Sequence, residues 1–149
     1  MLHRSDEGYE VILASVYMYG GAIVNTNMFR ILMSSIANSF VKNLLSIQGL
    51  MTISSFYRLY RGGTVRRLQA IYGDGILERS GFECMVEMVM KMVYLGTTIS
   101  EVPLVLDTSM RVGRSKMKVL KTIRGYLTLA THKNRWKTIA QARQASNLG

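Results

Sequence analysis

The residues best suited to chemistry form one dense group between positions 111 and 118. The group holds four cationic side chains around a glycine and a serine: Arg111, Arg114, Lys116, Lys118, Gly113 and Ser115. Arginine offers a planar fork of donors, lysine offers a mobile point charge, and glycine lets the backbone approach a ligand closely. These properties suit a loop that closes over phosphate. The alternative is a solvated basic loop, because runs of charge usually lie at the surface.

The charge of the chain is concentrated in the same region. Residues 1–107 contain nine Lys and Arg and nine Asp and Glu, whereas residues 108–149 contain ten Lys and Arg and no acid. The formal net charge of +10 therefore belongs to the last 42 residues. A one-sided block of this kind indicates an anionic partner, which could be a phosphorylated ligand, an anionic membrane surface or nucleic acid.

Length and composition exclude several other classes of protein. A chain of 149 residues is long enough for one hydrophobic core. Its most apolar stretch, 31–53, is interrupted by polar residues, so the sequence predicts no membrane-spanning helix. The single cysteine, Cys84, excludes an internal disulfide and fits a reducing cytoplasm. His3 and His132 are far apart and lack neighbouring cysteines or acidic clusters, so no metal site is assigned.

Hydrophobic periodicity predicts the elements that must position these residues. The strands are expected at 9–15, 55–60 and 98–106, and the helices at 27–46, 64–72, 81–95 and 115–131. This alternation indicates an α/β fold. Pro103 places the third strand at a sheet edge or at a strand end. The first strand comes with no helix before it, which is typical of an edge strand or of a truncated larger domain.

Two of the predicted helices are expected to have distinct faces. Helix 27–46 should bury Ile31, Leu32, Ile36, Phe40, Val41 and Leu44 and carry a polar stripe of Arg30, Ser34, Asn38 and Lys42. Helix 115–131 should bury Met117, Leu120, Ile123 and Leu127. The tail after Lys133 is weakly helical, and its Trp136 lies among three cations. This composition predicts a contact with anionic lipid, with the tryptophan at the interface.

Six short segments follow one another in an informative order. They are Val11-Ile-Leu-Ala-Ser-Val-Tyr17 with Gly20-Gly21, then Arg30, Ser34 and Asn38, then Ser54-Ser-Phe-Tyr-Arg-Leu-Tyr-Arg61, Gly81-Phe-Glu with Glu87, Glu101-Val-Pro103, and Arg111-x-Gly-x-Ser-Lys116. In this order they resemble the C-terminal half of family-2 glycosyltransferases, close to the dolichyl-phosphate and polyprenyl-phosphate sugar transferases. The resemblance implies an α/β fold that is a partial GT-A domain, of the nucleotide-diphospho-sugar transferase type, without its N-terminal nucleotide-binding half. Residues 1–131 would belong to the catalytic domain, and residues 132–149 would form a basic tail.

The resemblance assigns roles to three residues before the basic loop. Arg30 and Ser34, one helical turn apart, match the positions that hold the acceptor phosphate. Arg58 matches the arginine near the donor diphosphate. The alternative for the first pair is an exposed stripe on a helix. The alternative for Arg58 is an arginine held in a salt bridge on a strand.

The resemblance assigns the basic loop and the following face of the site as well. Arg111, Ser115 and Lys116 match a mobile loop that covers the donor and acceptor phosphates. Glu83 and Glu87 match a helix that lines the back of the site. For these two glutamates the alternative is an ordinary helix surface or cap.

The implied reaction transfers a sugar, with inversion, from a nucleoside-diphosphate sugar to a polyprenyl or dolichyl phosphate at the cytoplasmic membrane face. A phosphate oxyanion is already a nucleophile, so no strong general base is required. The family implies Mg²⁺ or Mn²⁺, but the Asp-x-Asp motif that would hold the metal is absent from this sequence. Weak or no transfer is therefore expected from this chain alone. Val16 stands where many relatives have a phosphate-binding arginine, which leaves the acceptor open.

Two other functions stay open at the level of sequence. The chain could be a catalytically inactive module that binds anionic membranes through its basic tail. Nucleic-acid binding ranks last, because the tail contains no recognisable reading motif and basic proteins bind nucleic acid non-specifically.

Overall fold

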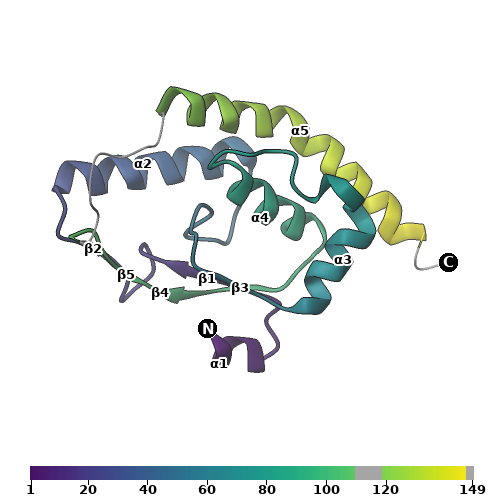
Figure 1. Cartoon of the computed structure of the whole chain (residues 1–149), viewed down its shortest axis with the longest axis horizontal. Helices are drawn as coiled ribbons and strands as arrows, with labels where there is room; N and C mark the ends of the chain where they lie inside the picture. The colour runs from purple at the N-terminus through teal and green to yellow at the C-terminus, as the bar shows by residue number, and fades with distance from the viewer. Residues whose placement is uncertain (110–118, 147–149) are drawn as a thin grey trace.

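The computed structural model describes residues 1–109 and 119–146, with side chains from Thr122 onward in the last helix (Figure 1). The elements follow the chain in the order α1 (Leu2–Asp6), β1 (Val11–Ser15), β2 (Ala22–Val24), α2 (Met28–Leu45), β3 (Arg58–Tyr60), α3 (Gly62–Tyr72), the 3₁₀ turn η1 (Gly73–Ile76), α4 (Cys84–Tyr94), β4 (Ile99–Pro103), β5 (Val105–Asp107) and α5 (Val119–Ser146). The short helix α1 and the strand β2 were not expected from the sequence. The described chain is a mixed α/β structure, so the predicted fold class is confirmed at this level.

A small mixed sheet forms the base of the structure. Its strand order is β3-β1-β4, with β3 antiparallel and β4 parallel to β1. The central strand β1 is buried along its whole length, as its run of apolar residues predicts. Pro103 ends β4, and among the described strands β4 pairs only with β1, so the predicted position at a sheet edge or strand end is confirmed. A separate two-stranded parallel sheet pairs β2 with β5.

The turn from β1 to β2 requires its two glycines. Gly20 has a φ of +84°, a conformation that favours glycine, and lies beside the Pro103 ring. A Cβ on Gly21 would lie 2.4 Å from the carbonyl oxygen of Ser15, which is far closer than atoms can approach. The turn is therefore folded tightly against the end of β4.

A buried ion pair on α4 organises the core on the helical side of the sheet. Lys91 and Glu87 are one turn apart, both have no exposed surface, and their Nζ and Oε1 atoms lie 2.5 Å apart. Lys91 Nζ also donates hydrogen bonds to the carbonyl oxygens of Gly75 at 2.6 Å and Ile76 at 3.1 Å. The lysine is thereby satisfied by one charge and two carbonyls, as a buried ammonium requires.

Glu87, the acidic partner of this pair, holds the segment that leads into α4. The Glu87 carboxylate accepts hydrogen bonds from the backbone N–H groups of Glu78 at 2.9 Å and Arg79 at 3.0 Å. The Trp136 ring of α5 covers the pair, with its centroid 4.4 Å from Lys91 Nζ, a cation–π contact. One ion pair thus connects α4 to the 75–79 segment and to α5.

The C-terminal region is a single helix rather than a weakly helical tail. Helix α5 is continuous from Val119 to Ser146, so it runs through the boundary expected at residue 131. Trp136 has no exposed surface, and its Nε1 donates to Glu78 Oε1 at 3.0 Å. The expectation that Trp136 contacts lipid is therefore wrong. The physical reason is that this ring is needed to cover the buried lysine.

The expected apolar face of α5 is also wrong for the residues that the structure describes. Ile123 and Leu127 are 45% and 49% exposed, whereas the fully buried positions include Leu129, Trp136 and Ala140. These three are spaced seven and four residues apart, which places them on one face of the helix. Periodicity identified the apolar stripe that contains Ile123 and Leu127, but the stripe that contains Leu129, Trp136 and Ala140 is the one buried in the core.

Helix α2 begins and ends through local hydrogen bonding. The Oδ1 atom of Asn27 accepts from the backbone N–H of Phe29, and the helix stops at Ser46 in a left-handed conformation with φ of 57°. Only Val41 and Leu45 of this helix are buried. The expected apolar positions Leu32, Ile36 and Phe40 are 52–57% exposed, so the prediction that they are buried is wrong. No described element covers that face.

Changing Gly21 to alanine should destabilise the protein. The added Cβ must displace the Ser15 carbonyl, at a cost of about 1–3 kcal/mol. Urea unfolding followed by circular dichroism measures the free energy. Gly63→Ala is the matched control, because it lies in α3 with no atom within 4 Å of the new Cβ and should change stability by no more than about 1 kcal/mol. Equal effects of the two changes would contradict the argument.

Glu78→Gln should lower stability at neutral pH but not in acid. Burial raises the pKa of Glu78, but the Trp136 hydrogen bond and the charges of Lys91 and Arg135 outweigh it, so the folded-state pKa lies below the ordinary value. The contribution of this carboxylate is therefore present above about pH 4.3, the unfolded value, and is lost as pH falls through the folded pKa. Urea midpoints at pH 7 and near pH 3 should show a gap between wild type and variant that closes in acid. A gap that persists in acid would contradict this, and the exposed Asp74→Asn should show none at either pH.

Candidate functional site

The turn after β1 meets α2 at a pair of hydroxyl groups. The Tyr17 hydroxyl and Ser34 Oγ are hydrogen-bonded at 2.7 Å. Arg30 lies one turn before Ser34, is exposed, and has no hydrogen-bond or ion-pair partner among the described residues. Two hydroxyls beside an unpaired guanidinium are groups that can bind a phosphate monoester. The structure therefore places Ser34 in contact with Tyr17, and Arg30 lies one helical turn before Ser34 on the same helix.

A carboxylate of β4 fixes the loop that follows α2. Glu101 accepts hydrogen bonds from the backbone N–H groups of Met51 at 2.6 Å and Thr52 at 2.7 Å. Asn38 of α2 donates from Nδ2 to the carbonyl of Met51 at 2.7 Å, which leaves its Oδ1 buried without a partner in the described part of the chain. The Glu101 carboxylate therefore binds backbone amides, and these hydrogen bonds join β4 to the loop before β3.

Arg58, which the sequence suggested for the donor diphosphate, is engaged with carbonyl groups. Its Nη1 donates to the Met85 carbonyl at 2.7 Å, its Nη2 to the Ile53 carbonyl at 2.9 Å, and its Nε to the Ser55 carbonyl. Nη1 also lies 3.3 Å from the Tyr60 hydroxyl. A guanidinium has five N–H groups, so these contacts leave one on Nη2 for a ligand. Its role toward a diphosphate stays a prediction, and the contacts that exist join the 53–58 segment to α4.

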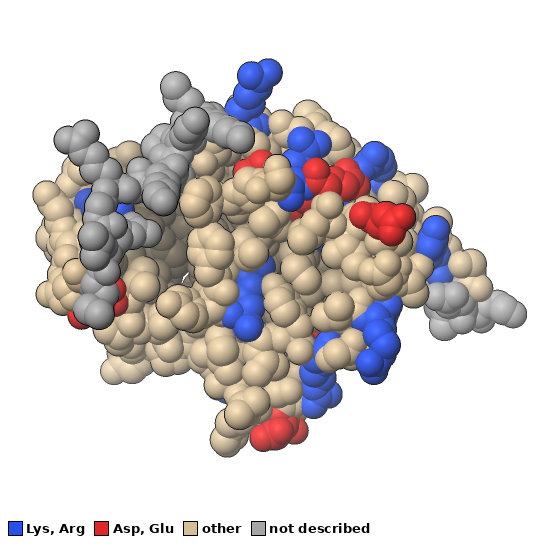
Figure 2. Space-filling model, in the orientation of Figure 1, with Lys and Arg blue, Asp and Glu red and all other residues tan. Residues whose placement is uncertain are grey.

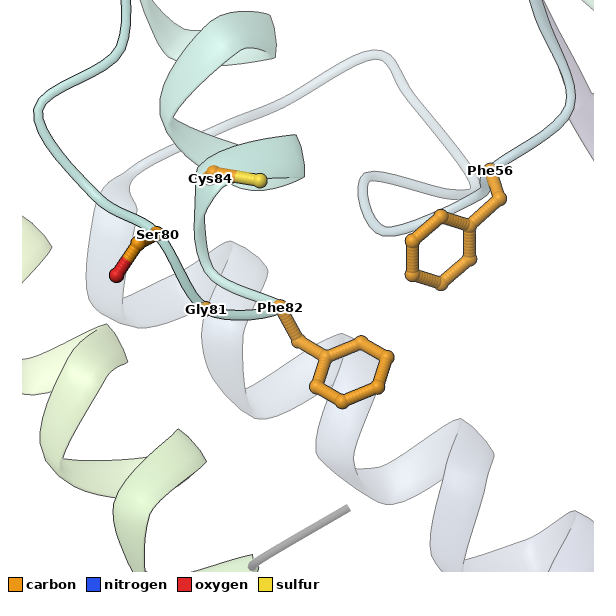
Figure 3. A pocket seen from close by; sticks show the side chains of 5 residues that line it. All are labelled: Phe56, Ser80, Gly81, Phe82 and Cys84. Atoms are coloured by element: carbon orange, nitrogen blue, oxygen red, sulfur yellow. The ribbon is translucent and has the colours of Figure 1, made fainter. Parts of the chain in front are cut away.

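An open pocket of about 310 Å³ lies between that segment and the start of α4 (Figure 3). It is lined by Phe56, Ser80, Gly81, Phe82 and Cys84. The two phenylalanine rings make an edge-to-face contact, with centroids 5.7 Å apart. Burial, then the negative charges of Glu83 and Glu87, raise the pKa of the Cys84 thiol, so it is a poor nucleophile. Cys84 is half-buried and lines this pocket.

Two glycines make room for a carboxylate beside the pocket. A Cβ on Gly81 would lie 2.3 Å from a Glu83 carboxylate oxygen, and a Cβ on Gly125 of α5 would lie 2.7 Å from its carboxyl carbon. The Glu83 side chain therefore fills a slot between the start of α4 and α5, with 9% of its surface exposed. Burial and this carboxylate both raise the pKa of the Tyr126 phenol. The slot could have been found in the sequence only by knowing that both glycines face the Glu83 side chain.

The described part of the chain does not test the remaining predicted site residues. Arg111, Ser115 and Lys116 lie outside the described residues. Across residues 1–109 and 119–146 no group of three or more His, Cys, Asp or Glu side chains could hold a metal ion. The described residues therefore do not fit the divalent metal that the resemblance implies, and no chemical step is assigned to one. In the same part of the chain, no helix combines the length and the apolar character needed to span a bilayer.

Segments that are distant in the sequence meet around these contacts. Tyr17 contacts Ser34, Arg58 contacts Met85, and Glu101 contacts the loop that precedes Ser54. Five of the six segments singled out in the sequence thus belong to one connected region. Within residues 1–109 and 119–146 no hydrogen bond or ion pair links Arg30 to Arg58, so the predicted acceptor and donor phosphate sites remain two separate places.

Comparison with known proteins gives a limited result. No protein-family model matches the chain. A 117-residue segment is 26% identical to the polyprenol monophosphomannose synthase of Mycolicibacterium smegmatis. The match covers 78% of this chain but 42% of that enzyme, so the chain corresponds to less than half the length of this relative.

Arg58→Lys should destabilise the region between β3 and α4. A lysine cannot donate to three carbonyls at once, and each lost hydrogen bond from a charged donor costs about 1.5–3 kcal/mol at most. The expected result is a lower free energy of unfolding and faster hydrogen exchange at Ser55–Tyr57. Arg66→Lys on the exposed side of α3 is the control and should change stability by less than about 0.5 kcal/mol. An Arg58 variant as stable as this control would show that the carbonyl contacts contribute little.

Proposed function

We propose that this chain forms the acceptor side of a family-2 glycosyltransferase that acts on a polyprenyl or dolichyl phosphate. The observation that carries the proposal is the hydrogen bond between Tyr17 and Ser34 beside the unpaired Arg30. The similarity to a polyprenol monophosphomannose synthase supports the same class of acceptor. The proposed place of action is the cytoplasmic face of a membrane, where a lipid phosphate is presented to water-soluble sugar nucleotides.

The proposed chemistry needs binding groups more than a base. An oxygen of the acceptor monophosphate forms a bond to the anomeric carbon, and the bond from that carbon to the nucleoside diphosphate breaks. The phosphate is the nucleophile, so the protein must hold it and must neutralise the charge of the two phosphorylated partners. Arg30 would supply a charged donor, and the hydroxyls of Ser34 and Tyr17 would orient the phosphate oxygens.

The donor side of the proposal rests on fewer observations. Arg58 retains one N–H for a diphosphate, and the loop residues Arg111, Ser115 and Lys116 are proposed to cover it by resemblance alone. The metal-binding Asp-x-Asp segment is not in this sequence. We therefore propose that sugar transfer requires a further polypeptide segment that binds the nucleoside-diphosphate sugar and its Mg²⁺ or Mn²⁺.

A second candidate is a membrane-binding module without transferase activity. The exposed apolar face of α2 favours it, because such a face has no role in phosphate chemistry. The two candidates differ in whether the chain recognises a phosphate monoester. Nucleic-acid binding has no observation in its favour beyond the net charge.

Arg30→Ala should weaken binding of a soluble short-chain polyprenyl monophosphate, such as citronellyl phosphate, by about tenfold or more. That factor corresponds to the loss of one charge-assisted contact. Isothermal titration calorimetry measures the affinity, and Arg66→Ala is the control because it removes one exposed cation elsewhere. Arg30→Lys should recover part of the affinity, because it restores the charge without the fork.

Two results would contradict the proposed function. One is a loss of affinity in Arg66→Ala that equals the loss in Arg30→Ala, which would indicate attraction to net charge. The other is equal binding of citronellyl phosphate and citronellol, since the alcohol has no phosphate for the site to recognise.

A further inference from the structure

Glu83 is a buried carboxylate that the described chain leaves without a partner. The residue is 9% exposed, and no hydrogen bond or ion pair reaches its carboxylate from residues 1–109 and 119–146. By contrast, the Glu87 carboxylate is paired with Lys91, and that of Glu101 accepts from two backbone N–H groups. A carboxylate taken out of water without a partner is unfavourable, so Glu83 needs a donor or a positive charge from elsewhere.

The Glu83 carboxylate adjoins the open pocket at the start of α4. Gly81 is part of the pocket lining, and a Cβ on it would lie 2.3 Å from Glu83 Oε2 and 2.9 Å from Oε1. Because glycine has no side chain, the carboxylate can lie directly against this part of the lining. The slot that holds Glu83 and the pocket are therefore neighbouring parts of one site.

Two phenylalanine rings form the apolar part of the pocket. Phe56 is 60% exposed and Phe82 is 42% exposed, although the two rings contact each other. Figure 3 shows the rings on one side of the pocket, with the Cys84 side chain pointing toward that side and the Ser80 side chain pointing away. Exposed aromatic rings pack against a flat apolar group, and their faces attract a cation.

The charges nearest the pocket favour a cation over an anion. None of the five lining residues is charged. Burial, then the charges of Glu83 and Glu87, raise the pKa of the Cys84 thiol, and the opposing effect of Arg58 is smaller. Because Lys91 neutralises Glu87, Glu83 is the main source of negative charge here. Figure 2 shows acidic and cationic side chains interspersed over the region of α4 and α5, so no patch of one sign on that face outweighs the nearest charges.

We propose that the pocket and the Glu83 slot together bind an organic cation, namely an amidinium, guanidinium or primary ammonium group on a flat apolar body. The cationic group would donate to the Glu83 carboxylate beside Gly81, and the apolar body would lie against Phe56 and Phe82. A planar cation suits the site best, because it is weakly hydrated and stacks on aromatic rings. The pocket volume of about 310 Å³ is enough for a small ligand. The inference goes beyond the proposed function, since it uses none of the residues assigned to the acceptor phosphate.

The first test is an NMR titration of the full chain with benzamidine at constant ionic strength. The amidinium and the phenyl ring of this probe match the two parts of the site. Saturable shifts of the backbone amide signals of Gly81, Phe82 and Gly125 are expected, with a dissociation constant of about 1 mM or lower. Benzamide has nearly the same shape without the charge, and it should bind more weakly by about tenfold or more.

Variants of the two parts of the site test each contribution. Glu83→Gln should weaken benzamidine binding by about tenfold or more, to the level of benzamide. The matched control is Asp74→Asn, which removes an exposed carboxylate elsewhere and should leave the affinity unchanged. Phe82→Leu should weaken binding by about two- to fivefold, because leucine keeps apolar volume but lacks the attraction of an aromatic face for a cation. Spectra without the probe show whether each variant is folded.

Three results would overturn the proposal. They are equal affinity of the wild type for benzamidine and benzamide, unchanged benzamidine affinity in a folded Glu83→Gln variant, and no saturable shift at Gly81 and Phe82 up to about 20 mM probe. If Glu83→Gln does not fold, the comparison of benzamidine with benzamide on the wild type still decides. A wild type that binds benzamidine as expected but does not bind citronellyl phosphate would support this inference and overturn the proposed function alone.

Discussion

The structure depends on burying one lysine in a core that is otherwise apolar. An ammonium group without partners is costly in such a place, so Lys91 must have its charge and its donors satisfied before α4 can pack. Glu87 supplies the negative charge, two carbonyls of η1 accept hydrogen bonds, and the Trp136 ring covers the ammonium group. Because the partners come from different parts of the chain, satisfying one side chain fixes the positions of α4, the segment before it and α5 together.

The geometry of the candidate site depends on α4, which the contacts of Lys91 hold in place. The first turn of α4 provides the Met85 carbonyl that binds Arg58, and it also presents Phe82 and Cys84 to the pocket. Glu101 holds the loop on the other side of Arg58 through two backbone amides. Hydrogen bonds to backbone groups therefore hold Arg58 and the loop before β3 in place. Arg30 on α2 takes no part in these bonds and stays exposed, one helical turn from Ser34.

The sequence predicted the elements better than it predicted their faces. The strand β1 and the helices α2 and α4 lie within a few residues of the expected ranges, because their apolar periods are clear. Periodicity cannot decide which of two apolar stripes packs, so the buried face was misassigned on both α2 and α5. Trp136 looked like a membrane anchor because its neighbours in sequence are cations, whereas its neighbours in space are Lys91 and Glu78. For the site, the family resemblance singled out the two segments that contain Tyr17 and Ser34. It did not show that Arg58 and Glu101 form hydrogen bonds with backbone groups, because those bonds depend on tertiary contacts.

The slot that holds Glu83 has a consequence for how this region can evolve. The carboxylate fits only because the positions that face it, Gly81 and Gly125, have no side chain. A homologue with a larger residue at position 125 must have a shorter side chain at position 83, or move α5 away from α4 and uncover Lys91. The three positions should therefore change together across related sequences, and an acid at position 83 should accompany glycine at the other two.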